Sequence, residues 1–122
     1  MNPIKRTDWQ TKPLSEKRAK LNLDKVYSKQ LSIIIKDGFR PKEFEDKWFI
    51  FYENNTLYCH RSWTGTCIYE VHFIEKNDSI RATHAYVNRD IEQYNYTNDD
   101  EDIETIYWLI DPFMRDSWFR DS

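Results

Sequence analysis

Six consecutive residues gather most of the side chains in this sequence that could contact a ligand. The segment His60–Gly65 reads HRSWTG, so an imidazole, a guanidinium, two hydroxyls and an indole follow one another directly. The Arg61 guanidinium is a planar fork that fits phosphate, and the Trp63 indole offers a flat face to a nucleobase. Ser62, Thr64 and backbone N–H groups could hold further oxygens. The segment predicts a grip for a phosphate and a base, although it also fits a plain hairpin turn with the glycine at positive φ.

Three histidines recur at twelve-residue spacing, at His60, His72 and His84. On successive strands this spacing can place imidazoles side by side, as in a metal site or an acid–base cluster. Whether they share a face depends on strand registers that the sequence does not fix. We predict no metal and no cofactor, and we assign His60 to the phosphate grip.

A second set of candidates lies further along the chain. Arg89 could extend the phosphate grip, and Tyr94 belongs to a polar, aromatic stretch that could close over a nucleoside. Each also has a structural interpretation, as a surface ion pair for Arg89 and as cover for the sheet edge for Tyr94. The predicted ligand-binding residues are His60, Arg61, Ser62, Trp63, Thr64, Tyr69, Arg89 and Tyr94.

No motif with a fixed catalytic mechanism is present. The sequence has no GxSxG, no P-loop and no Rossmann glycine fingerprint, and its two glycines leave a phosphate grip to side chains. We therefore predict no catalytic residue, and a protein that is not an enzyme is favoured.

Composition excludes several classes of partner. The net charge of -3 argues against a nucleic-acid duplex, which needs a concentrated basic surface, but allows a small anionic ligand held by a few local cations. No apolar run reaches the roughly 18 residues of a membrane span, and the N-terminal segment lacks the apolar region of a secretory signal. We expect a cytoplasmic protein with no membrane partner. Cys59 and Cys67 could form a cross-strand disulfide, but reduced thiols are favoured in that compartment.

Periodicity predicts the elements that position these residues. Residues 1–13 form an arm pinned by Trp9, and residues 14–122 form one α+β domain. Helices are expected over 14–21 and 23–35, followed by a loop over 39–47 with Phe44 turned inward. Strand-like runs at 47–53, 56–62, 66–75 and 79–88 predict a four-stranded antiparallel meander. A C-terminal helix opening at the acidic run 99–102 should pack on one face, with the tail 113–122 folding back onto the domain.

The sequence resembles small bacterial and phage proteins of unassigned function that carry an HRSWTG signature. The likeness covers residues 38–110, and its elements are Trp48-Phe49-x-Phe51-Tyr52, Leu57-Tyr58, the hexapeptide and Ile68-Tyr69. Such modules occur alone or joined to ADP-ribose-handling domains such as macrodomains or ADP-ribosylglycohydrolases. The resemblance implies an ADP-ribose-like or related nucleotide ligand, and it brings no established catalytic residue.

Three functions follow in order of preference. The first is non-catalytic binding of a small nucleotide, an ADP-ribose derivative or a cyclic nucleotide, in the manner of a phage anti-defence protein that sequesters an immune signal. The second is a small enzyme that cleaves or transfers ADP-ribose, with His60 or Glu70 as the acid or base. The third is a protein-interaction module such as an inhibitor or immunity protein. A homo-oligomer stays open in each case.

Overall fold

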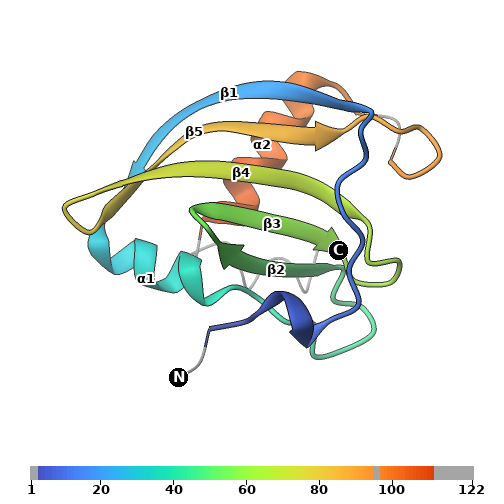
Figure 1. Cartoon of the computed structure of the whole chain (residues 1–122), viewed down its shortest axis with the longest axis horizontal. Coiled ribbons are helices and arrows are strands. Elements are labelled where there is room, and N and C mark those ends of the chain that lie inside the picture. Colours follow the sequence, from blue (N-terminus) through green and yellow to red (C-terminus); the bar gives the residue numbers. More distant parts are fainter. Residues whose placement is uncertain (1–2, 95–96, 112–122) are drawn as a thin grey trace.

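An antiparallel sheet dominates the part of the chain that the computed structural model describes, which is residues 3–94 and 97–111. Figure 1 shows this sheet with two α-helices, so the predicted α+β class is confirmed. The sheet has five strands in these residues, however, where four were predicted. In chain order the elements are η1 (Arg6–Asp8), β1 (Arg18–Tyr27), α1 (Lys29–Asp37), β2 (Trp48–Glu53), β3 (Thr56–Arg61), β4 (Cys67–Lys76), β5 (Ser79–Asn88) and α2 (Asp99–Ile110).

The strands lie in the order β1-β5-β4-β3-β2, so β2 to β5 form the predicted meander. Two of its turns, Asn54-Asn55 and Asn77-Asp78, have positive φ at both central residues, between 52° and 69°. Turns of this kind match the twist of two adjoining strands, and asparagine and aspartate tolerate them best after glycine.

The fifth strand, β1, stands where the first helix was predicted. It runs antiparallel to β5, from Arg18 opposite Asn88 to Tyr27 opposite Ile80. Leu21 and Leu23 are both buried and the residue between them is exposed, which is the period of a strand. The predicted helix over 14–21 is therefore wrong, and the second helix begins at residue 29 rather than 23.

A side chain caps the N-terminus of each α-helix. The Ser28 side chain accepts a hydrogen bond from the Leu31 N–H, and Gly38, at φ 76°, ends α1. Asn98 caps α2 by accepting from the Glu101 N–H at 2.9 Å, and the first turn of α2 is entirely acidic. No helix in the described ranges is long and apolar enough to cross a membrane. The tail predicted to fold back lies outside those ranges.

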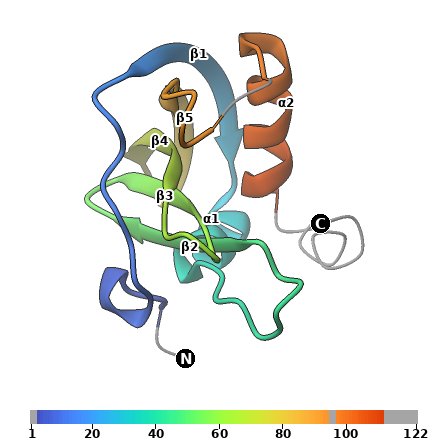
Figure 2. The ribbon, with the colours of Figure 1, turned by 90° about the vertical axis from the view of Figure 1, so that its right-hand side faces the viewer.

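The two faces of the sheet have different covers. Figure 2 shows α2 on one side of the sheet and the N-terminal arm, residues 3–17, on the other. Tyr69, Val71 and Phe73 of β4 share one face of the sheet, as strict alternation predicts, and they lie in the buried core on the helix side. Cys59 and Cys67 are buried reduced thiols, also as predicted, and burial raises the pKa of Cys67.

A β-bulge in β5 reverses the alternation predicted for that strand. The register between β4 and β5 shifts at Thr83, and beyond it Ala85 and Val87 face the core. Strict alternation along the predicted strand 79–88 would place His84 on the face of the buried Ala82, and this expectation is wrong. It lies instead on the arm side of the sheet, directly opposite His72.

Candidate functional site

The N-terminal arm holds the turn that connects β3 and β4. The Lys12 N–H donates to the Gly65 carbonyl at 2.8 Å, and the Trp9 indole N–H donates to the Ser62 carbonyl at 2.8 Å. The Trp9 ring also stacks on Phe49 of β2, with 5.8 Å between centroids. The prediction that Trp9 attaches the arm is confirmed, and the turn is fixed at several points.

His60 supports this turn from inside the protein. It is 1% exposed, and its Nδ1 lies 2.9 Å from the Gly65 carbonyl. A carbonyl only accepts, so Nδ1 carries the proton and Nε2 is left as an acceptor. The ring lies against Phe49 and Phe51, and burial lowers its pKa, which keeps the imidazole neutral. This geometry positions the turn and keeps His60 away from the surface.

Ser62 has a similar place in the structure. It is buried, and its hydroxyl donates to the Asp46 carbonyl at 2.6 Å. Its N–H donates to the Lys47 carbonyl. The loop over 39–47 is thereby bound to the turn, and Ser62 has little left to offer a ligand.

Trp63 and Thr64 form the exposed tip. Trp63 is 61% exposed and stacks on Phe44 at 4.5 Å, with its indole N–H donating to the Phe44 carbonyl. Phe44 is itself 75% exposed, so the prediction that it turns inward is wrong. Its ring braces one face of the indole instead of filling the core. The Thr64 hydroxyl donates to Thr66 and is otherwise at the surface.

Arg61 lies beside the tip, and no carboxylate of residues 3–94 or 97–111 pairs with it. Its guanidinium sits 4.6 Å above the Trp48 ring, which positions it by a cation–π contact. Within the described residues it makes no side-chain hydrogen bond or ion pair. The charge is thus oriented by Trp48, and among the described residues no carboxylate neutralises it.

Tyr69, Arg89 and Tyr94 are brought together, but around a buried carboxylate and not around the tip. Asp102 Oδ1 accepts from the Tyr69 hydroxyl at 2.8 Å and from the Tyr94 hydroxyl at 3.0 Å. Arg89 pairs with Asp102 and Asp99, each at 2.7 Å. Its guanidinium therefore pairs with carboxylates of the first turn of α2, and it does not line the cationic cavity with Arg61. Burial raises the pKa of both tyrosines.

The tip lies between two surface cavities. The cationic cavity, of about 280 Å³, is lined by Lys47, Arg61, Trp63, Thr64 and Gln93. The aromatic cavity, of about 330 Å³, is lined by Trp9, Gln10, Ser62, Trp63, Thr64 and Gly65. Trp63 and Thr64, which line both cavities, are among the residues that the sequence predicts. Lys47 of the cationic cavity and the arm residues of the aromatic cavity are not. Gln93 precedes Tyr94 in the polar, aromatic stretch that was expected to close over a nucleoside. Nothing in the sequence distinguishes Lys47 from the other lysines as a site residue.

The face of the sheet on the side of the N-terminal arm carries a different group of titratable residues. His72 and His84 stack in parallel, with centroids 4.6 Å apart. His60 lies four residues along β3 from Thr56, the residue opposite His72, so the three imidazoles do not form one cluster. Glu70 points to this same face, because it pairs with Tyr58 and Tyr86, and burial raises its pKa. It is therefore on the opposite side of the sheet from Arg61, which packs on core-facing Trp48.

The three histidines should make the folded protein less stable at acidic pH. Burial lowers the pKa of His60, His72 and His84 from the ordinary 6.5, and the charges of His72 and Lys20 lower the pKa of His84 further. The unfolded chain then binds more protons than the folded one, so stability falls as pH drops through 6.5. We expect a lower Tm at pH 5 than at pH 7. The Tm of a His72→Gln, His84→Gln double variant should fall less between pH 7 and pH 5 than that of the native protein. If both fall equally, the stacked pair is not the cause of the pH dependence.

The likeness to HRSWTG-bearing proteins rests on the sequence alone. It stays a prediction, and the geometry of the tip carries the functional argument. No family model matches the chain, and neither a curated protein nor a solved structure matches it.

Proposed function

We propose that the protein binds a small nucleotide without chemical turnover, at the tip formed by Trp63 and Thr64. The anionic group would lie between Lys47 and Arg61, and the ring would stack on Trp63. One observation carries the proposal: two cations without an acidic partner in the described residues line the same cavity, in a protein of net charge -3. An anion is the ligand that this arrangement complements.

The arrangement is prepared before any ligand arrives. Trp48 orients the Arg61 guanidinium, and Phe44 supports the Trp63 ring. Side chains that are already ordered lose less entropy on binding. Charge-assisted hydrogen bonds contribute about 1.5–3 kcal/mol each, and stacking of one base about 1–3 kcal/mol. Together these magnitudes are sufficient for a specific small-molecule site.

The same geometry favours binding over catalysis. Of the two acid–base candidates, His60 is buried behind the turn and Glu70 faces the other side of the sheet. Neither lines the cationic cavity. Sequestration of an ADP-ribose derivative or a cyclic nucleotide signal requires affinity alone, and the resemblance to HRSWTG proteins supports that class of ligand.

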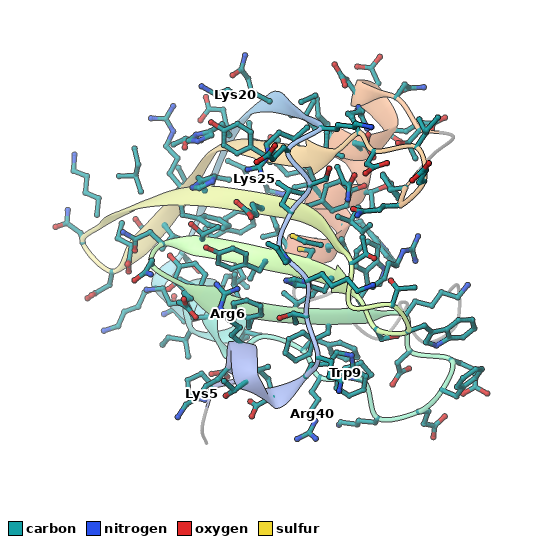
Figure 3. All side chains as sticks on the ribbon, turned by 45° about the vertical axis from the view of Figure 1, so that its right-hand side comes forward. Lys5, Arg6, Trp9, Lys20, Lys25 and Arg40 are labelled. Atoms are coloured by element: carbon teal, nitrogen blue, oxygen red, sulfur yellow. The ribbon has the colours of Figure 1, made fainter. Side chains whose placement is uncertain are left out.

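Calorimetry with ADP-ribose, NAD and cyclic dinucleotides tests the proposal. Arg61→Ala should weaken binding roughly 10- to 150-fold, because it removes charge-assisted hydrogen bonds. The matched control is Arg40→Ala, since Arg40 is an exposed arginine that lines neither cavity (Figure 3). Absence of binding to every nucleotide would sink the proposal. Chromatography of the recovered nucleotide separates binding from the alternative of an enzyme, which would return a changed molecule.

A protein partner is the second candidate, favoured by the exposed apolar pair Phe44 and Trp63. Exposed aromatic side chains of this kind are common anchors in protein interfaces. Under this reading no nucleotide binds, and Trp63→Ala prevents co-elution with a partner protein.

A further inference from the structure

We infer that the ring of the bound nucleotide lies in the aromatic cavity, and that the N-terminal arm selects which ring is accepted. This inference rests on the proposed function, which places the phosphate at Lys47 and Arg61. It assigns a recognition role to Gln10, and to Trp9 in addition to its part in attaching the arm.

The aromatic cavity has two indoles in its wall, and each is backed by a phenylalanine. Trp9 stacks on Phe49 with an interplanar angle of 19°, and Trp63 stacks on Phe44 with an angle of 23°. Each ring therefore has one face covered by protein, while its remaining surface contributes to the cavity wall. Among the residues that the structure describes, no charged side chain lines this cavity. Rigid indoles in a neutral surrounding suit a heteroaromatic ring better than a phosphate.

The two cavities are adjacent, because Trp63 and Thr64 line both. A ligand can thus extend over Thr64, with its anionic group in the cationic cavity and its ring in the aromatic cavity. Ligand sites usually measure about 300–1,000 Å³. The cationic cavity, at about 280 Å³, is small for a whole nucleotide, whereas the two cavities together fall well inside that range.

Gln10 is placed to read the edge of the ring. Its side chain is exposed and makes no hydrogen bond within the described residues, while the backbone around it is fixed by the bond from Lys12 to Gly65. A glutamine amide offers one donor and one acceptor side by side. Adenine presents the matching pair at N6 and N7, whereas guanine presents two acceptors at O6 and N7. We therefore expect adenine to be preferred over guanine.

Fluorine NMR on protein labelled with 5-fluorotryptophan locates the ring directly. Saturating ADP-ribose should shift the Trp9 and Trp63 signals and leave Trp108, which lines neither cavity, unchanged. Gln10→Ala should weaken ADP-ribose binding severalfold and remove its preference over the analogue in which guanine replaces adenine. Gln30→Ala, an exposed glutamine of α1, is the matched control and should change neither quantity.

The outcomes separate this inference from the proposed function. ADP-ribose binding that depends on Arg61 but leaves the Trp9 signal in place would overturn the ring subsite and spare the proposed function. Equal affinity for the adenine and guanine forms, unaltered in Gln10→Ala, would overturn the selection by the arm. No binding of ADP-ribose would overturn the inference altogether, and the other nucleotides of the panel then decide whether the proposed function stands.

Discussion

Asp102→Ala should destabilise the protein by about 3 kcal/mol. Asp102 is 0% exposed and accepts hydrogen bonds from the Tyr69 and Tyr94 hydroxyls. Its other oxygen pairs with Arg89. Removing one partner of a buried ion pair costs roughly 3–5 kcal/mol, and the lower end applies because Arg89 keeps its second carboxylate, Asp99. Urea unfolding followed by circular dichroism measures the change.

The control for this substitution is Asp100→Ala, in the same turn of α2. Asp100 is exposed, so its removal costs only the interaction with the helix dipole, about 0.3–1 kcal/mol. Asp102→Asn should fall between the two variants, because the amide oxygen still accepts from a hydroxyl but carries no charge for Arg89. Equal losses in Asp102→Ala and Asp100→Ala would show that the buried network contributes nothing beyond the dipole.

This network also explains why part of the site could not be predicted. Arg89 and Tyr94 have the right chemistry for a nucleotide, but the same chemistry lets them satisfy a buried carboxylate, and the sequence does not reveal that Asp102 is buried. The acidic run 99–102 predicts the start of a helix whichever of its members points inward. Only packing of α2 on the sheet decides that Asp102 does so.

Local signals fared better than periodicity in predicting the fold. The turns at Asn54-Asn55 and Asn77-Asp78, which join predicted strand runs, and the start of α2 in the acidic run 99–102 depend on backbone geometry within a few residues, and they were predicted correctly. The cap of α1 at Ser28 was not predicted. The identity of β1 depends on its pairing with β5, some sixty residues away in sequence. A short run containing both two- and three-residue apolar spacings is compatible with either structure until that partner is known.

The bulge at Thr83 had a similar effect on the candidate chemistry. Alternation assigns faces correctly only while the register is unbroken, and one extra residue moves every later side chain to the other face. His84 thereby joins His72, and the twelve-residue histidine spacing yields one stacked pair and a separate, buried His60. The residues of the tip could be grouped from the sequence because they are contiguous, whereas Lys47 and the arm come from other segments of the chain.

Gly65→Ala should destabilise the protein by roughly 2–4 kcal/mol and loosen the arm from the tip. Gly65 has φ 75°, a conformation that costs an alanine about 1–2 kcal/mol. A Cβ at this position would also lie 2.4 Å from the Gln10 carbonyl oxygen and 3.2 Å from its carbon. Both are backbone atoms, so no side-chain rotation relieves the contact. The arm would have to move, and the hydrogen bonds from Lys12 to Gly65 and from Trp9 to Ser62 would be lost with it.

Hydrogen exchange at the Lys12 amide, together with urea unfolding, distinguishes this mechanism from general damage to the turn. In Gly65→Ala the Lys12 N–H should exchange faster, while amides in β4 and β5 change only as far as global stability changes. Gln10→Ala is the control, because it keeps the carbonyl that the new methyl group would meet, and its stability should stay within about 0.5 kcal/mol of the native chain. Unchanged protection of Lys12 in Gly65→Ala would contradict the close approach of arm and turn. Since the arm forms one wall of the aromatic cavity, the same loosening should also reduce the affinity for ADP-ribose, which ties the backbone geometry at Gly65 to the binding site that we propose.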